Sequence, residues 1–327
     1  MNYKAPIMGF IWGTLLFLLC ALAATYGEKH SLEWLQFVSF AMLIVTPISV
    51  GALTLFLIPI KQAEDKSKRK YYAFLPVFGW SIISLIVQWE TIICIFMLLP
   101  LYLPLAFLGG KIGAGMKVKY KSKYKAGIIS CFALAPFLMI PLEQPLTAKS
   151  LRYSVTNSIQ INAPIERVWR NLSNIENIKP SELKWNISHF IGLPKPQKAT
   201  TKVVEIGAIR EIYWERGVHF QERITNIIPQ KLLAYDVIID EKSMEIAELD
   251  THITVGDQYF NVESGYYYLS EHQGQTYLSL TTSYRMTTKI NWYGKFWANF
   301  VLDDFHASVL HMIKLRNEKK NPSNEFI

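Results

Sequence analysis

Five long apolar runs fill the first 145 residues of this 327-residue chain, and they restrict its fold more than any other feature. A helix that crosses the hydrocarbon core of a bilayer needs about 20 residues, with a tolerated range of roughly 17–25. Alternating strands are not present in this part, and lipid leaves the backbone groups of a single segment no partner outside a helix. The sequence therefore predicts an α-helical membrane bundle of about five spans. The runs cover residues 7–25, 37–60, 73–89, 91–110 and 126–142.

The excess positive charge lies beside these runs. Residues 1–149 carry 14 Lys and Arg against 6 Asp and Glu, whereas residues 150–327 carry 20 of each. Most cations of the first part lie in the loops at residues 61–72 and 111–125, and cytoplasmic loops collect Lys and Arg. In a five-span count both loops face the cytoplasm. We therefore expect a multi-pass protein of the cytoplasmic (inner) membrane, with the chain after residue 142 on the periplasmic or extracellular side; an even number of spans would reverse that side.

Two segments of the membrane part resemble sequence motifs that have other functions. Residues 109–117 are rich in glycine, but Met116 stands where a phosphate-binding loop needs lysine, so we expect a flexible helix exit. Residues 117–125 alternate lysine with aromatic and small residues as a nucleic-acid strip does. Beside a membrane span they are expected to contact anionic headgroups, and no nucleic acid partner is predicted. No metal site, cofactor or disulfide framework is expected from the three cysteines, which all lie in apolar runs: Cys20, Cys94 and Cys131.

The composition becomes that of a globular domain near Glu143, which divides the chain into a membrane domain, 1–146, and a second domain, 147–327. The second domain reads as a strand, a short helix at 163–172, a loop at 191–200, further strands and a long closing helix at about 292–318. This pattern predicts an α+β fold. The closing helix carries an apolar stripe with a period of 3.6 residues, formed by Leu302, Phe305, Val309 and Ile313.

One hairpin can be read in register. Residues 209–214 and 218–224 each alternate, and a three-residue turn with Gly217 in the left-handed region is a common connection. In this register the apolar faces of both strands coincide. Arg210 and Glu222 then face each other on the inward side, where charges are stable only as a pair or in a wet cavity. A rigidifying ion pair and a ligand contact remain equally open. The expected pairs are Trp214 with Val218, Ile212 with Phe220, and Arg210 with Glu222.

Residues 159–169, with the sequence IQINAPIERVW, resemble the opening strand and helix of the START-like, polyketide cyclase (SRPBCC) superfamily. Further segments resemble one bacterial branch of that superfamily in the same order. The resemblance extends over residues 153–318 and includes none of the membrane part. These segments are residues 192–196, 207–210, 217, 220–225, 229, 274–276, 284, 297 and 306–314.

The resemblance implies a helix-grip fold, in which a curved antiparallel sheet wraps around a long C-terminal helix and leaves an apolar cavity between them. Members bind lipids, sterols or polyketides, and some catalyse cyclisation or hydrolysis. They share no catalytic residue set, so the resemblance supports a pocket more than a reaction. The chain departs from the branch at Asp303, where related sequences tend to have His. Carried over by position, the pocket candidates are Arg210, Trp214, Phe220, Glu222, Tyr284 and His306.

At several of these positions a role in packing is an alternative to a role in ligand binding or catalysis. His306 lies beside the apolar stripe of the closing helix, where a histidine is more often a core residue than an acid or base. Asp303 and His306 are too few for a metal site, and His311 points elsewhere. Serine-hydrolase and zinc-protease motifs are not present. Strand alternation places at least one of the tyrosines at 266–268 on the surface.

Three functions are consistent with these observations. The first is a membrane-anchored protein that binds or transfers a hydrophobic small molecule or lipid. The second is a cyclase or hydrolase that uses Glu222, Arg210 and His306 for proton transfer and anion stabilisation. The third is a membrane interaction or sensory protein whose pocket modulates its membrane domain. The sequence favours a ligand-binding protein over an enzyme and does not identify a protein partner.

Overall fold

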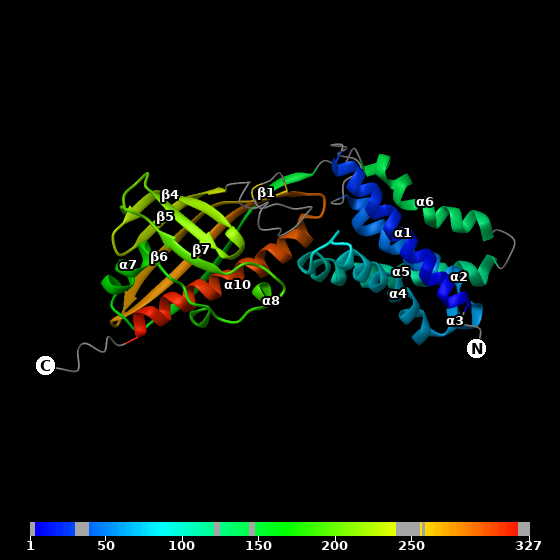
Figure 1. Ribbon diagram of the computed structural model, residues 1–327, viewed down its shortest axis with the longest axis horizontal. Coiled ribbons are helices and arrows are strands. Elements are labelled where there is room, and N and C mark those ends of the chain that lie inside the picture. The colour runs from blue at the N-terminus through cyan, green and yellow to red at the C-terminus, as the bar shows by residue number, and fades with distance from the viewer. Residues whose placement is uncertain are drawn as a thin grey trace. The chain divides into compact units, whose positions relative to one another are not determined.

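The computed structural model describes residues 4–29, 39–120, 125–143, 148–239, 256 and 259–319. The chain divides into two compact units, Met1–Ala148 and Lys149–Ile327. The described part of the first unit is helical, and the second unit combines one large sheet with helices (Figure 1). The expected sequence of a helical bundle followed by an α+β domain is therefore confirmed at the level of secondary structure.

Each of the five apolar runs forms a helix in the first unit. The third and fourth runs are joined by a tight turn, in which Gln88 has a φ of 58°. The second run begins with a π-helical turn, η2. The elements are α1 (Lys4–Lys29), η2 (Ala41–Val45), α2 (Thr46–Leu57), α3 (Ile60–Glu64), α4 (Lys66–Ile86), α5 (Ile92–Tyr120) and α6 (Lys125–Glu143).

Two of the described helices, α5 and α6, are long and apolar enough to cross a membrane, by length and composition. The expected count of about five spans is not supported. The described apolar parts of the first two runs, Phe10–Ala23 and Ala41–Leu57, are shorter than this length. Helix α4 has sufficient length but starts with a strongly basic turn, which reduces its apolar content. The length of an apolar run in the sequence therefore overestimates the length of the continuous apolar helix that it forms.

Glycines bring α2 and α5 into backbone contact. A Cβ atom on Gly109 or Gly113 of α5 would lie 1.9 or 2.0 Å from a carbonyl oxygen of α2, and one on Gly51 of α2 would lie 1.9 Å from a carbonyl oxygen of α5. Only glycine fits at such distances, and small residues four apart are a usual means of close helix packing in membranes. The expectation of a flexible helix exit is wrong, because α5 continues through these glycines to Tyr120.

The basic segment that follows is also partly structural. The Lys117 ammonium donates hydrogen bonds to the carbonyl oxygens of Phe56, at 2.7 Å, and of Ile58. These carbonyls end α2, and a cation there satisfies groups that have no partner within the helix. Lys117 therefore has an intramolecular role that the headgroup prediction missed. Residues 121–124 of the segment lie outside the described part of the chain.

We predict that Gly109→Ala destabilises the first unit. The added methyl group overlaps the α2 backbone, and overpacking typically costs about 1–3 kcal/mol, which outweighs the gain of about 1 kcal/mol in helix propensity. The measurement is the thermal unfolding of the purified full chain in detergent. Gly115→Ala is the control, since a Cβ there meets nothing within 4 Å. Equal melting temperatures for the two variants would contradict the packing role of Gly109.

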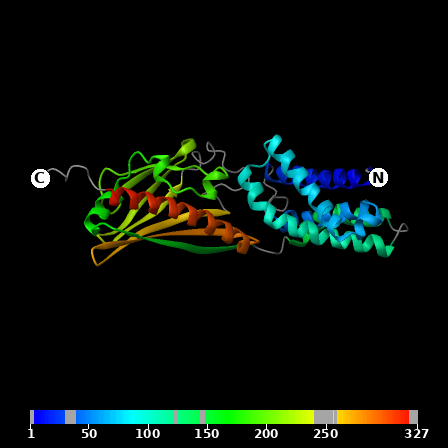
Figure 2. The same ribbon diagram turned by 90° about the horizontal axis from the view of Figure 1, so that it is seen from below.

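The second unit contains one antiparallel sheet of seven strands in the order β1-β7-β6-β5-β4-β3-β2. Figure 2 shows α10 (Asn291–Glu318) along one face of the curved sheet. Helices α7 (Ile165–Ser173) and α8 (Ile187–Phe190) and the short turns η3 (Pro180–Glu182) and η4 (Glu215–Gly217) complete the unit. The strands are β1 (Lys149–Ile161), β2 (Pro196–Thr200), β3 (Ile209–Trp214), β4 (His219–Ile228), β5 (Leu232–Ile239), β6 (Phe260–His272) and β7 (Gln275–Thr288).

Most local predictions for this unit are confirmed. The closing helix begins one residue earlier than expected, and its stripe is buried at Leu302, Val309 and Ile313 and half-buried at Phe305. The predicted loop at 191–200 is wrong in its second half, which forms the edge strand β2. Proline is tolerated at the start of an edge strand, so the prolines of this segment did not exclude a strand.

The core of the second unit lies between the inner face of the sheet and the helices α7 and α10. From the sheet it receives Leu278 and Leu280 of β7, and from the helices Val168 and Leu310, all of them at most 2% exposed. Burial of each such side chain contributes roughly 1.5–3 kcal/mol. This core fixes α7 against the sheet, and the end of α7 then defines one side of the site described next.

Candidate functional site

A buried ion pair stands on the inner face of the β3–β4 hairpin. Arg210 and Glu222 lie directly opposite each other, as predicted, and Ile212 likewise faces Phe220. The Arg210 Nη1 atom lies 3.0 Å from the Glu222 Oε2 atom, and the two residues are only 2% and 8% exposed. Arg210 Nη2 also donates to the carbonyl oxygen of Leu172, at 3.0 Å. The pair therefore connects the sheet to the last turn of α7.

Two tyrosines from neighbouring strands complete this group, which we call the polar cluster: Arg210, Glu222, Tyr235 and Tyr267. The Tyr267 hydroxyl interacts with the Arg210 guanidinium, and the Tyr235 and Tyr267 rings lie 6.1 Å apart. Gly265 makes room for Tyr235, because a Cβ there would lie 2.7 Å from the Tyr235 hydroxyl oxygen. Tyr235 was not predicted from the sequence, and Tyr267 was noted there only as one of three adjacent tyrosines.

Burial and charge set the protonation of the polar cluster. Burial lowers the pKa of Arg210, but the attraction of Glu222 and of the two tyrosines outweighs it, so the pKa lies above its ordinary value. Burial raises the pKa of Glu222, and the attraction of Arg210 opposes this shift. Burial also raises the pKa of Tyr267 to about 12 and that of Tyr235 further. Both tyrosines are therefore neutral phenols beside a permanent cation.

One donor of this cluster is not used within the described residues. The Arg210 Nε atom is buried and has no hydrogen-bond partner there. A buried donor without an acceptor costs about 1–3 kcal/mol. A hydrogen-bond acceptor placed at Nε would recover this energy.

His306 lies elsewhere in the interior and is fully satisfied. Its Nε2 atom lies 2.8 Å from the Thr282 hydroxyl and its Nδ1 atom 2.7 Å from the Asn157 side-chain oxygen. Burial lowers the pKa of His306 to about 4, so the ring is neutral near pH 7. The packing interpretation of His306 is supported by these bonds, which connect α10 to both β1 and β7.

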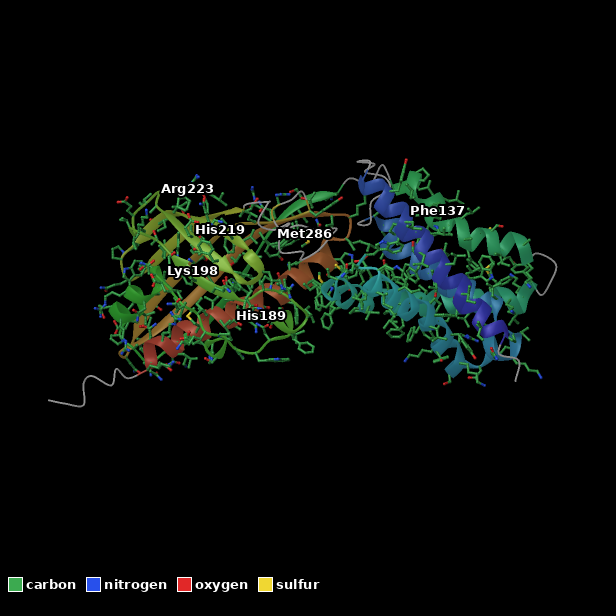
Figure 3. The ribbon with its side chains drawn as sticks, in the orientation of Figure 1. Phe137, His189, Lys198, His219, Arg223 and Met286 are labelled. Atoms are coloured by element: carbon green, nitrogen blue, oxygen red, sulfur yellow. The ribbon has the colours of Figure 1, made fainter. Side chains whose placement is uncertain are left out.

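The other predicted residues form two further groups. The Trp214 ring contacts those of Phe220 and Phe305, with centroids 5.7 and 4.8 Å away. Tyr284 is buried, and its hydroxyl donates to the Asn299 side-chain oxygen at 2.7 Å. Thus all six predicted residues point inward, but the structure distributes them among four places. On the outer face of the hairpin, His219 pairs with Glu211 at 2.6 Å (His219 is labelled in Figure 3).

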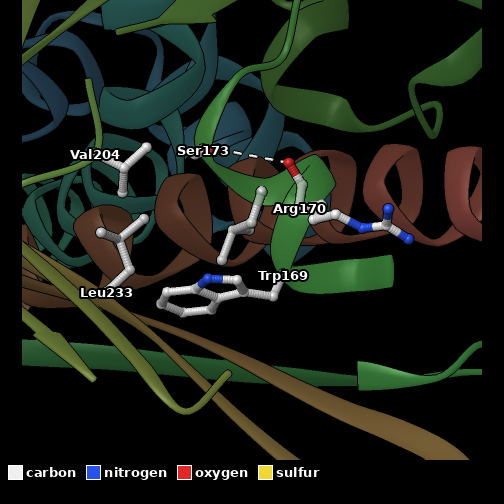
Figure 4. A pocket seen from close by; sticks show the side chains of 6 residues that line it. Trp169, Arg170, Ser173, Val204 and Leu233 are labelled. Atoms are coloured by element: carbon white, nitrogen blue, oxygen red, sulfur yellow. Dashed lines mark hydrogen bonds between the residues drawn. The ribbon is translucent and has the colours of Figure 1, made fainter. Parts of the chain in front are cut away.

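A pocket of about 210 Å³ opens between the end of α7, the segment at 201–208 and β5. Figure 4 shows Val204 and Leu233 on one side of it and Trp169 on the other. None of the six predicted residues lines this pocket. Leu172 connects the pocket with the polar cluster, because its carbonyl accepts the bond from Arg210. The lining residues are Trp169, Arg170, Leu172, Ser173, Val204 and Leu233.

Within the described ranges of the chain, no group of three or more His, Cys, Asp or Glu side chains could hold a metal ion. The described cysteines all lie in the first unit. Among the described residues of the second unit, the apolar pocket and the adjacent polar cluster are the features that combine burial with ionisable groups.

Comparison with protein-family models and with curated proteins finds no match for this chain. Solved structures align with about half of it. Zhui aromatase/cyclase from Streptomyces sp. R1128 is 14% identical over 53% of this chain and 99% of its own, with a TM-score of 0.33. Truncated norcoclaurine synthase from Thalictrum flavum is 12% identical over 53% and 98%, with a TM-score of 0.32. Protein NE0264 from Nitrosomonas europaea is 10% identical over 51% and 96%, with a TM-score of 0.33.

The fold of the second unit follows from its own topology. A curved antiparallel sheet of seven strands, closed on its inner face by a long C-terminal helix, is a helix-grip fold. This is the fold that the resemblance to the START-like superfamily implied.

We predict that His306 makes the second unit less stable in acid. The unfolded histidine binds a proton below about pH 6.5, whereas the folded one resists protonation down to about pH 4. The contribution of neutral His306 to the free energy of unfolding is thus fully present above about pH 6.5. It declines as the pH falls toward 4, by on the order of 3 kcal/mol in total. Hydrogen exchange of α10 and β7 peptides at about pH 7 and pH 5, corrected for intrinsic rates, measures this. His306→Gln should flatten the dependence, and an unchanged pH slope in that variant would refute it.

We further predict that Arg210→Met strongly destabilises the second unit. Loss of one partner leaves the Glu222 carboxyl buried without compensation, which costs about 3–5 kcal/mol in comparable pairs. The double variant Arg210→Met, Glu222→Leu should recover much of this loss. Arg152→Met is the control, because it removes an ion pair with Glu263 in which Arg152 is largely exposed. The prediction fails if Arg210→Met and Arg152→Met reduce the melting temperature of the full chain equally.

Proposed function

We propose that this protein binds or transfers a hydrophobic small molecule or lipid in its helix-grip domain, which a membrane domain anchors to the cytoplasmic membrane. In this proposal residues 1–146 form the membrane domain and residues 147–327 the ligand-binding domain. The observation that carries the proposal is the pocket beside the polar cluster. Four of its lining residues are apolar or aromatic, and the adjacent Arg210 has an unused donor.

These features favour an amphipathic ligand. Trp169, Leu172, Val204 and Leu233 offer contacts to an apolar chain or ring, whereas Arg210 matches a carbonyl, carboxylate or phosphate oxygen. The pocket volume of about 210 Å³ is below the roughly 300–1,000 Å³ of typical small-molecule sites. We therefore propose that the pocket receives one end of a longer ligand. The Glu222 carboxylate keeps the guanidinium in place while that end binds.

The basic segment at the end of α5 and the start of α6 supports the orientation of the anchor. Residues 111–125 contain six lysines and no acidic residue, as is usual near the cytoplasmic face of a membrane. Because α6 begins in this segment, a single crossing by α6 puts the second domain on the periplasmic or extracellular side. This reasoning needs only the α5–α6 pair and does not depend on the number of helices that precede it.

Native mass spectrometry of the purified full chain tests ligand binding. We expect a co-purified lipid or other hydrophobic molecule, which Val204→Trp removes by filling the pocket. Val203→Trp is the matched control, since Val203 is the adjacent exposed residue and does not line the pocket. Retention of the same ligand by both variants would exclude this pocket, and absence of any bound molecule from wild-type protein would exclude the proposed function.

An enzymatic role is the second candidate, and the environment of Glu222 favours it. A buried carboxyl with a raised pKa beside a cation and neutral phenols is suited to proton transfer. The two candidates differ in the fate of the ligand. A binder releases the molecule that it took up, whereas an enzyme releases a product of different structure. Glu222→Gln should then abolish the conversion without abolishing ligand uptake.

A further inference from the structure

Two large apolar side chains at the start of α10 are exposed. Trp292 is 65% and Phe296 58% exposed, and the two residues are one helical turn apart on the same face. Adjacent large apolar groups on a surface usually mark an interaction site. The next helical position, Trp297, is 5% exposed. We call Trp292 and Phe296, together with Lys295 between them, the aromatic ridge.

The aromatic ridge carries positive charge as well as apolar surface. Lys295 is exposed, and its ammonium group lies 4.9 Å from the centre of the Tyr153 ring. Lys289 lies just before the helix. Tryptophan prefers the headgroup region of a bilayer, and lysines near it are attracted to anionic lipids by about 1 kcal/mol each. This combination fits the surface of a membrane with anionic headgroups.

The covalent chain keeps the ridge close to a membrane helix. The Asn291 side chain donates to the carbonyl oxygen of Lys149 at 2.7 Å, so the start of α10 is fixed to the first residue of β1. Lys149 follows Glu143, the last residue of α6, by six residues. Six residues span at most about 21 Å. If α6 crosses a bilayer, the ridge cannot move far from the surface where α6 emerges.

We infer that Trp292 and Phe296 insert into the interfacial layer of the bilayer that holds α6, while Lys295 contacts anionic headgroups. This inference rests on the membrane anchoring in the proposed function. Insertion orients the domain on the lipid surface. It adds a second, reversible attachment to the covalent one.

A depth measurement on the reconstituted full chain tests the inference. The three native cysteines are replaced by serine or alanine, and a nitroxide is attached to Phe296→Cys. Vesicles contain phosphatidylcholine with or without phosphatidylglycerol. We expect oxygen, which concentrates in lipid, to relax this label more than a water-soluble nickel complex does. The reverse order is expected at the control site, Tyr268→Cys, an exposed tyrosine on the outer face of the sheet.

The charge dependence gives a second readout. Lys295→Glu should shift the Phe296→Cys label toward water, and it should do so more in vesicles that contain phosphatidylglycerol. A label at 296 that is as accessible to nickel as the one at 268 would overturn the inference. A label shielded from both reagents would overturn it too, because protein rather than lipid then covers the ridge.

Failure of the membrane anchor itself is distinguishable from these outcomes. Vesicle flotation reports whether the full chain is membrane-bound before any label is examined. A chain that does not float with vesicles contradicts the anchoring in the proposed function, and the inference with it. A chain that floats but has a water-exposed label at 296 contradicts the inference alone.

Discussion

A buried charge pair sets the geometry of the second domain around its site. Isolated charges cannot remain in an apolar interior, so Arg210 and Glu222 must lie opposite each other, and only one register of the β3–β4 hairpin allows this. Arg210 also requires the Leu172 carbonyl, which fixes the end of α7 over the hairpin. The pocket beside Leu172 exists because α7 ends there. Charge compensation thus determines where this pocket lies.

In the first unit the constraint is the close approach of helix backbones. Its helices approach through glycine rather than through large side chains, and Gly51, Gly109 and Gly113 each face a backbone carbonyl of the neighbouring helix. Lys117 then satisfies carbonyl groups at the end of α2. Both units therefore depend on a few residues, through close backbone contact in the first unit and through charge pairing in the second. The remaining apolar residues of each unit are more readily exchanged for others of similar size.

Local patterns of the sequence were sufficient for the hairpin and the closing helix. Turn length and alternation determine a register within some fifteen residues, so the facing of Arg210 and Glu222 could be predicted. Tyr235 and the contact of Tyr267 with Arg210 could not, because they depend on the order of distant strands in the sheet. Val204 was missed for a related reason. It lies in a segment without periodicity, and only the packing of α7 makes it part of a pocket.

The bond between Asn291 and Lys149 has a mechanical consequence. The linker from the first unit enters the sheet through β1, which pairs with β7 from Lys149 opposite Thr288 to Ile161 opposite Thr276. Any tension that reaches Lys149 along the linker is therefore carried by the backbone pairing of β1 with β7. Asn291 transmits part of the same tension to α10. The start of β1 and the start of α10 would thus respond to such tension together rather than separately.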